Sequence, residues 1–146
     1  DYNFSRNKTG AFNVFDSSQN QRGYRPTHES CLMRDMRVKE FCSVDKENMW
    51  LRFLAKVSLI DDFDIDIERK KVKIETVDLD GIDLKWFKKI GRSWKEKTNL
   101  RGKKDFEYSR SDFGEYKVTI TLNHAEIRKK SSVLKKEKTF NLNNEL

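Results

Sequence analysis

The sequence predicts an α+β protein in which a loop-rich segment with one amphipathic helix is followed by a small antiparallel β-sandwich. Between residues 45 and 60, apolar side chains recur at spacings of three and four, as on one face of a helix. From about residue 66 onward, apolar and charged side chains alternate, which is the pattern of half-buried strands. We therefore expect two domains, at residues 1–63 and 64–146.

The segment before the helix is polar in its first part. Residues 1–22 are rich in Asn, Ser and Gln, with isolated aromatic side chains such as Phe12 and Phe15. A polar stretch of this kind is typical of a loop. We expect it to dock its few aromatic side chains onto another surface.

The helix is expected at about residues 45–60. Asp45 is a candidate N-cap, and Val44 before it can pack on Met49 as a hydrophobic staple. Two aspartates follow shortly after Leu59, and because negative charge is unfavourable at a helix C-terminus, the helix should stop near Leu59. The broad apolar stripe favours a helix that faces a core, with a binding helix as the alternative. The stripe comprises Met49, Trp50, Phe53, Leu54, Val57 and Ile60.

The second domain carries several alternating segments separated by turn signals such as Asp80-Gly81. Turns at these intervals are typical of a small β-sandwich. The residues that mark the alternation are Val72, Ile74, Thr76, Ile82, Leu84, Trp86, Tyr116, Val118, Ile120, Leu122, Ala125, Ile127, Phe140 and Leu142.

One motif makes the sandwich prediction more specific. Residues 112–118 read Asp-Phe-Gly-Glu-Tyr-Lys-Val, which matches the D-x-G-x-Y-x-C pattern around the tyrosine corner of immunoglobulin-like domains, with Val118 in place of the usual cysteine. In that corner the tyrosine hydroxyl hydrogen-bonds to the backbone just upstream. We therefore expect Tyr116 to lock the corner and Trp86 to be the buried tryptophan of the central strand, in an immunoglobulin-like sandwich held by packing alone.

The charge of the chain bears on its partners. The formal net charge is +7, from 31 Lys and Arg against 24 Asp and Glu. Lysine outnumbers arginine, which indicates a basic composition spread over the surface rather than a nucleic-acid site. Nucleic acid is therefore not expected as a partner. No apolar run is long enough to cross a bilayer, so no membrane span is expected either.

The start of the chain bears on its origin. Asp1 is the first residue, with no initiator methionine and no apolar signal-peptide core around it. The chain is expected to be a piece of a longer, secreted protein. Two glycosylation sequons, at Asn3 and Asn7, agree with secretion, although such matches also arise by chance in a chain rich in Asn and Ser.

The segment of residues 23–44 is dense in special residue types. It holds the only proline, Pro26, both cysteines and His28. Proline fixes a turn, and a mixture of this kind usually frames a site. Cys31 and Cys42 lie eleven residues apart, which suits a disulfide in an oxidising compartment, with a pair of free buried thiols as the alternative.

Four short stretches together resemble the C-terminal part of the IgA-peptidase-like zinc metallopeptidases. They are Gly23-Tyr24-Arg25-Pro26-Thr27, Ser30-Cys31-Leu32-Met33-Arg34, Phe41-Cys42-Ser43-Val44 and Trp50-Leu51. The resemblance covers residues 10–60 and departs at Asp45, where the family usually has another cysteine. It implies the C-terminal part of a secreted, zinc-dependent endopeptidase, followed by an immunoglobulin-like domain.

The catalytic zinc site of such an enzyme is not contained in this chain. Peptide-bond hydrolysis there needs an H-E-x-x-H helix, in which two histidines bind Zn²⁺ and the glutamate activates water. The chain has no such motif, and His28 and His124 cannot replace it because catalytic zinc needs three protein ligands. The resemblance implies zinc ligands upstream of Asp1 and none in this chain. The chain alone would then be inactive, packing on an upstream catalytic domain that acts on a protein or peptide substrate.

In that setting, Tyr24, Arg25 and Met33 are the residues expected to frame the site. Met33 is a candidate for the methionine that lies beneath the zinc ligands in metzincin-type enzymes, with ordinary packing as the alternative. Tyr24 and Arg25 can stabilise an oxyanion or hold a substrate carboxylate, whereas a salt bridge to Glu29 or an aspartate is the alternative role for Arg25. His28 is expected to be a loop histidine and not a metal ligand.

A second class of function stays open, namely a non-catalytic immunoglobulin-like interaction module that binds protein or glycan. Its basic runs, Arg128–Lys130 and Lys135–Lys138, would then contact acidic glycans or proteins. The other interpretation of these runs is a solvated sheet edge, where lysines discourage strand-to-strand aggregation. An H-E-x-x-H motif encoded upstream of this chain would favour the enzyme over the module.

Overall fold

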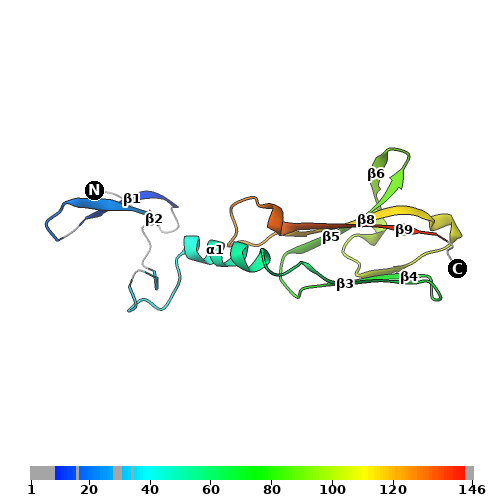
Figure 1. Ribbon diagram of the computed structural model, residues 1–146, viewed down its shortest axis with the longest axis horizontal. Coiled ribbons are helices and arrows are strands. Elements are labelled where there is room, and N and C mark those ends of the chain that lie inside the picture. The colour runs from blue at the N-terminus through cyan, green and yellow to red at the C-terminus, as the bar shows by residue number, and fades with distance from the viewer. Residues whose placement is uncertain (1–8, 16, 28–30, 34, 144–146) are drawn as a thin grey trace. The chain divides into compact units, whose positions relative to one another are not determined.

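The computed structural model describes residues 9–15, 17–27, 31–33 and 35–143. Within these ranges the protein is mostly β, with nine strands, one α-helix and three short 3₁₀ turns (Figure 1). The β-rich α+β class expected from the sequence is therefore confirmed. No helix in the described ranges has the length and hydropathy needed to cross a membrane.

The chain divides into two compact units. We call Asp1–Arg52 the N-terminal unit and Phe53–Leu146 the β unit. The sequence placed the domain boundary after residue 63, but strand β3, at Ile60–Asp66, runs through that position and pairs inside the β unit. The residues just after the helix therefore belong with the strands.

The N-terminal unit contains a β-hairpin. Strand β1 (Thr9–Phe15) pairs antiparallel with β2 (Gln21–Thr27), and Gln19 in the connecting turn has a positive φ of 63°. The prediction of a loop over residues 1–22 is therefore wrong for the part of this segment that is described. The pairing register shifts twice along β1, and each shift breaks the alternation by which a strand is recognised in sequence.

Helix α1 spans Ser43–Leu54, so it starts and ends earlier than the expected residues 45–60. At its start, the Lys46 amide donates to the Cys42 carbonyl at 3.0 Å, which makes Cys42 the N-cap residue. Asp45, the expected N-cap, lies inside the first turn instead. Its carboxylate accepts hydrogen bonds from two cysteine side chains rather than capping the helix.

The end of α1 is set by the β core that follows it. The Val57 amide donates to the Phe53 carbonyl at 2.9 Å, which closes the last turn. Leu59 is fully buried in the core of the β unit, and Ile60 begins β3. The apolar residues after Leu54 thus extend the β core instead of the helix, and Leu54 is the only buried residue of α1.

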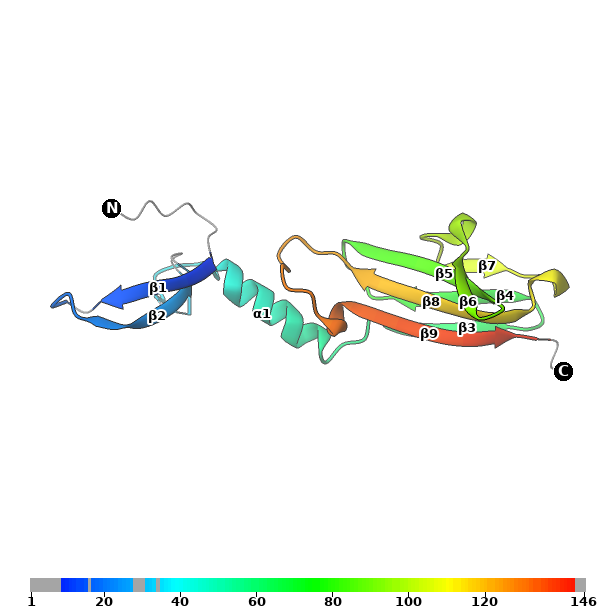
Figure 2. The same cartoon turned by 90° about the horizontal axis from the view of Figure 1, so that it is seen from above.

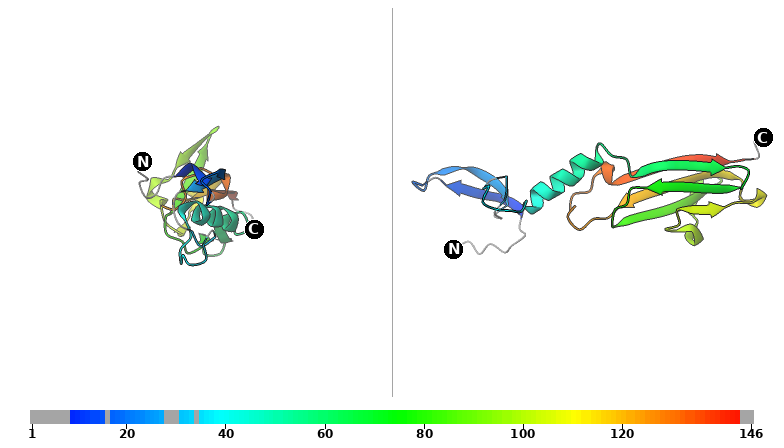
Figure 3. Two further views of the ribbon diagram at one scale, coloured as in Figure 1. Left: turned by 90° about the vertical axis from the view of Figure 1, so that its left-hand side faces the viewer. Right: turned by 90° about the horizontal axis from the view of Figure 1, so that it is seen from below.

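The β unit consists of two antiparallel sheets, with strand orders β3-β4-β7 and β6-β5-β8-β9. Figure 1 shows them as two layers, and the right panel of Figure 3 views them from the side of β3 and β4. The strands are β3 Ile60–Asp66, β4 Lys71–Thr76, β5 Ile82–Ile90, β6 Ser93–Glu96, β7 Asp105–Glu107, β8 Gly114–Leu122 and β9 Lys135–Leu142.

The core of the β unit lies between its two sheets. Trp86 on β5 and Tyr116 on β8 are fully buried. The centroid of the Trp86 ring lies 5.0 Å from that of Phe106 on β7, and the Phe140 ring on β9 lies 4.9 Å from that of Phe63 on β3, so aromatic rings join the sheets. Alternation in the sequence predicted most of this core. The predicted residues that are buried are Val72, Ile74, Thr76, Leu84, Trp86, Tyr116, Val118, Ile120, Leu122 and Leu142.

The hydrogen bond expected of a tyrosine corner is present. The Tyr116 hydroxyl donates to the Asp112 carbonyl at 2.9 Å. The Asp112 carboxylate in turn accepts bonds from the amide and the hydroxyl of Ser109, at 3.1 and 3.0 Å. These bonds, led by the one from the Ser109 amide, lower the pKa of Asp112 and fix the turn that leads into β8.

The strand expected around Ala125 and Ile127 does not form. Residues 123–131, all of them described, contain no strand, and the Ile127 amide donates to the His124 carbonyl at 3.0 Å to close a turn. Two alternating apolar residues are too few to fix a pairing register. Strand β9 begins only at Lys135 and lies at one edge of its sheet (Figure 2).

Candidate functional site

The residues expected to frame a site lie in the N-terminal unit, on or after strand β2. Tyr24 on β2 is 69% exposed, and Met33 in the segment that follows is 74% exposed. Arg25 is also on β2, but its side chain falls outside the described part, as does the whole of His28. Tyr24 and Met33 therefore present their side chains to solvent, and the site-framing role of these residues stays a prediction.

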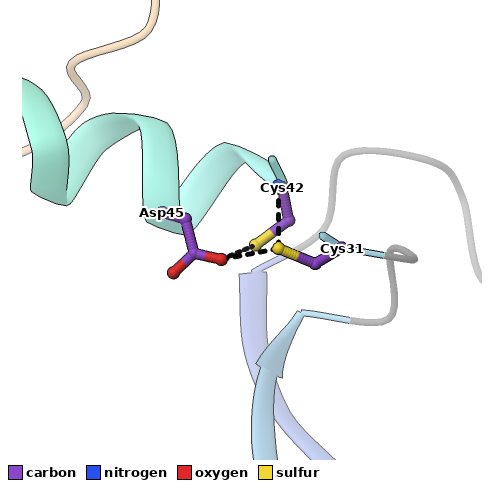
Figure 4. Close-up of side chains that lie close together, drawn as sticks. All are labelled: Cys31, Cys42 and Asp45. Atoms are coloured by element: carbon purple, nitrogen blue, oxygen red, sulfur yellow. Dashed lines mark hydrogen bonds between the residues drawn. The ribbon is translucent and has the colours of Figure 1, made fainter. Parts of the chain in front are cut away.

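The two cysteines do come together, and they meet a third side chain. Cys31 and Cys42 are both buried, at 4% exposure. Each sulfur donates to the same oxygen, Oδ2 of Asp45, at 2.6 Å from Cys31 and 3.2 Å from Cys42 (Figure 4). The three potential ligand atoms lie within 4.8 Å of one another. We call these residues the Cys31–Cys42–Asp45 cluster.

Two local structures build this cluster. Cys42 caps α1 and Asp45 lies three residues further on, so both project from one side of the first helical turn. Cys31 is brought to the same place by a closed loop, in which the Leu32 amide donates to the Glu40 carbonyl at 2.8 Å. The Cys42 amide then donates to Cys31 Sγ at 3.2 Å.

The Cys42 thiol does not have the electrostatics of a nucleophile. Burial is the main reason that the pKa of the Cys42 thiol rises to about 11, with smaller and opposing contributions from hydrogen bonds to Asp45. Cys42 therefore stays protonated at neutral pH, which agrees with its S–H donating to a carboxylate. Catalytic cysteines need the thiolate form, so Cys42 suits binding or structural chemistry better than catalysis.

Two sulfur atoms and a carboxylate oxygen at this spacing suit disulfide formation or metal binding. Both cysteines are free thiols in the structure, and the disulfide expected between them stays a prediction. Sequence reasoning assigned Asp45 to a helix cap and so missed its place in the cluster. The signal for it is the C-x-x-D spacing from Cys42, which is the C-x₂-C spacing of many metal sites with an oxygen ligand in place of the second sulfur.

The β unit presents two shallow hollows near its basic runs. One, of about 400 Å³, is lined in part by Arg128–Lys130, and it lies beside the end of β8. The other, of about 380 Å³, includes residues of the second run, Lys135–Lys138, together with Asp61 and Asp62. The second run lies on the edge strand β9, where lysines protect an exposed edge from pairing.

The structure thus brings the predicted cysteine pair together with Asp45 and leaves Tyr24 and Met33 exposed. Comparisons with protein-family models, with curated proteins and with solved structures found no match. The candidate sites are therefore those that the geometry defines. They are the Cys31–Cys42–Asp45 cluster of the N-terminal unit and the basic hollow of the β unit.

Proposed function

We propose that the N-terminal unit is the C-terminal part of the catalytic domain of a secreted, zinc-dependent metallopeptidase, followed by an immunoglobulin-like accessory domain. One observation carries this proposal. Among the described hydrophobic side chains of the N-terminal unit, only Cys31 and Cys42 are buried. A small unit whose described residues bury so few apolar side chains needs another surface to hold its fold. The upstream catalytic domain implied by the sequence resemblance supplies such a surface.

The exposed apolar side chains of the N-terminal unit support the same proposal. Met36 is 91% exposed, and Met33 and Tyr24 are exposed to a similar extent. Val14, Phe15 and Met49 are exposed as well. Single exposed apolar side chains are ordinary on a protein surface, but here only two hydrophobic side chains among the described residues of the unit are buried. The pattern is that of a segment that packs on a larger domain.

Within this proposal the residues of the chain have supporting roles. The catalytic zinc, held by an H-E-x-x-H helix upstream, activates the water that hydrolyses the peptide bond. Met33 packs beneath the zinc ligands. Tyr24 and Arg25 contact the oxyanion or a carboxylate of the substrate.

The strand order supports an immunoglobulin-like sandwich in the β unit. Strands β3, β4 and β7 take the places of strands A, B and E of that fold, and β5, β8 and β9 those of C, F and G, with β6 as an added edge beside β5. The buried Trp86 then lies on the strand equivalent to C. The Tyr116 hydroxyl bond falls at the start of the strand equivalent to F, where the tyrosine corner is found.

Expression of the longest reading frame that contains this chain tests the proposal. That frame should encode an H-E-x-x-H motif upstream, and its product should cleave a protein substrate. A zinc chelator should abolish the cleavage and added Zn²⁺ should restore it, while the 146-residue chain alone stays inactive. A frame without the motif, or peptidase activity in the 146-residue chain, would contradict the proposal.

The role of Met33 is tested in the same full-length enzyme. Met33→Leu should weaken zinc retention or turnover by about tenfold, because a residue that supports the metal ligands is replaced by one of different shape. Met36→Leu is the matched control, since Met36 is 91% exposed on the same segment, and it should leave the kinetics unchanged. Unchanged zinc content and turnover in Met33→Leu would discard the role.

A non-catalytic interaction module that binds protein or glycan is the second candidate. The hollow of about 400 Å³ lined in part by Arg128–Lys130 favours it, because clustered cations attract acidic ligands. The module should bind a sulfated glycan such as heparin in a manner that salt and Lys130→Glu both weaken. Heparin binding together with an upstream frame that lacks H-E-x-x-H would favour the module over the peptidase.

A further inference from the structure

The donor atoms of the Cys31–Cys42–Asp45 cluster converge on a small volume. Both sulfur atoms donate to one carboxylate oxygen, at 2.6 and 3.2 Å, and all three atoms lie within 4.8 Å of one another (Figure 4). Both cysteines are buried, whereas no other described hydrophobic side chain of the N-terminal unit is. The two most water-protected hydrophobic side chains among those described in this unit are therefore potential metal ligands.

We propose that these three side chains bind a zinc ion that stabilises the N-terminal unit. Thiolates and carboxylates are zinc ligands, with Zn–S about 2.3 Å and Zn–O about 2.0–2.2 Å in tetrahedral geometry. Those lengths place a sulfur and an oxygen ligand about 3.5 Å apart. From their present distances of 2.6 and 3.2 Å, the Cys31 and Cys42 sulfur atoms need to move only about 0.9 and 0.3 Å from Oδ2 of Asp45.

The net charge of such a zinc site suits its position at the start of α1. On binding, each thiol releases its proton to solvent and its sulfur bonds to zinc, while the Asp45 carboxylate exchanges two S–H donors for the metal. Two thiolates, one carboxylate and Zn²⁺ carry a net charge of about −1. That charge lies at the start of α1, where the helix dipole favours negative charge. The Cys42 amide, which already donates to Cys31 Sγ at 3.2 Å, remains as a hydrogen bond to a ligand sulfur.

The third donor favours a metal over a disulfide. A disulfide uses only the two sulfur atoms and removes both S–H groups that now donate to Asp45, which leaves a partly buried carboxylate beside two sulfur atoms that cannot donate. Zinc uses all three donors. Two soft sulfur ligands and one hard oxygen also suit zinc, which accepts both kinds, and the fourth tetrahedral position stays open to water.

The scarcity of buried apolar side chains among the described residues of the N-terminal unit gives the ion a structural role. Small units that bury little apolar surface are commonly stabilised by a disulfide or a metal. Zinc at this cluster would join the loop at Cys31 to the first turn of α1. The site needs no part of the peptidase mechanism, and it is tested in the 146-residue chain by itself.

The experiment is a metal titration of the reduced, metal-free 146-residue chain. Co²⁺ should bind with one ion per chain, giving a sulfur-to-cobalt charge-transfer band and the visible bands of a tetrahedral site, and Zn²⁺ should displace it. Cys31→Ser and Cys42→Ser should each lose about half of the charge-transfer intensity and weaken Zn²⁺ binding by at least tenfold, because each removes one of the two thiolates.

Substitutions at Asp45 test the oxygen ligand. Asp45→Asn should weaken Zn²⁺ binding by about tenfold, because a neutral amide is a poorer zinc ligand than a carboxylate. Asp45→Cys should strengthen it, because a third thiolate is a better zinc ligand than a carboxylate. Asp35→Asn is the matched control: this carboxylate is on the same loop but pairs with Arg37 at 2.9 Å, so zinc affinity should not change. Tryptophan fluorescence and circular dichroism confirm that each variant is folded.

Three results would overturn the proposal. The first is the absence of a thiolate charge-transfer band when Co²⁺ is added to the folded, reduced chain. The second is a disulfide. A chain purified without reductant would then have a mass lower by two hydrogen atoms, contain no reactive thiol and bind no Zn²⁺. The third is Zn²⁺ affinity that is unchanged in both Cys42→Ser and Asp45→Cys. The gain expected for Asp45→Cys keeps the test decisive if a serine variant fails to fold.

Discussion

At the scale of single residues, the β unit satisfies the polar ends of its buried rings through backbone carbonyls. The Tyr116 hydroxyl donates to the Asp112 carbonyl at 2.9 Å, and Trp86 Nε1 donates to the Lys103 carbonyl at 2.9 Å. A buried ring whose polar donor has no hydrogen-bond partner is costly. Because each acceptor carbonyl belongs to a loop, each of these bonds also holds one loop against the core. The rings thus contribute apolar burial and also hold the connections between strands in place.

The first prediction concerns the hydroxyl of Tyr116. Tyr116→Phe should lower the free energy of unfolding by about 1–2 kcal/mol, because it removes a buried hydrogen bond and leaves the Asp112 carbonyl without that donor. Tyr108→Phe is the control, since the Tyr108 ring is also buried but its hydroxyl forms no hydrogen bond within the described residues. Urea denaturation of both variants measures the difference, and equal losses would contradict the role of the corner.

The second prediction concerns alkaline pH. Burial, followed by the nearby charge of Asp112, raises the pKa of Tyr116 to about 12 from an ordinary value of 10.0. The unfolded chain therefore loses this proton before the folded chain does. The stabilisation is complete below pH 10 and is lost as the pH rises toward 12. Between these values wild-type stability should fall faster than that of Tyr116→Phe, and parallel pH profiles would refute the assignment.

Local motifs in the sequence predicted some of these contacts, whereas others depend on segments that the fold brings together. The Tyr116 bond was predictable because both partners lie within one short motif, and the burial of Trp86 because it belongs to an alternating strand. The hydrogen bond from Cys31 to Asp45 was not predictable, because a closed loop of the chain brings Cys31 to that position. Viewed with its near neighbours alone, Asp45 resembles an ordinary helix cap.

At the scale of elements, alternation identified strands only where the pairing is regular. Strands β5 and β8 pair without a register shift, and the residues that the alternation marked on them are buried, apart from the half-buried Ile82. Thr119 on β8 is also buried, although the alternation did not mark it. Strand β3 was not predicted, because its run of aspartates hides the alternation and a register shift after Ile60 interrupts it further. Helix α1 was predicted too long because apolar residues of the next core continue its spacing.

The third prediction concerns the turn into β5. Gly81 has a φ of 85°, and an added Cβ there would collide with the backbone carbonyl of Asn123, whose amide bonds to the Gly81 carbonyl at 2.8 Å. Gly81→Ala should therefore cost about 3 kcal/mol or more. Gly91→Ala, at a φ of 63° with open space around it, should cost only about 1 kcal/mol. Thermal unfolding of both variants measures this ordering, and a smaller loss at Gly81 would contradict it.

At the scale of the whole molecule, the two units are held by different means. The β unit has an apolar core between two sheets, whereas the described hydrophobic side chains that the N-terminal unit buries are only its two cysteines. We infer that the β unit is ordered by its own packing. We propose that the order of the N-terminal unit depends on the Cys31–Cys42–Asp45 cluster.

Hydrogen exchange of the backbone amides in the reduced 146-residue chain, with and without one equivalent of Zn²⁺, tests this claim most directly. We predict that the amides of β8 exchange slowly and equally in both states. The amides of Leu32 and Cys42, which bond inside the cluster and its loop, should exchange rapidly without metal and at least tenfold more slowly with it. Slow exchange of these two amides in the metal-free chain, or no response to Zn²⁺, would contradict the claim.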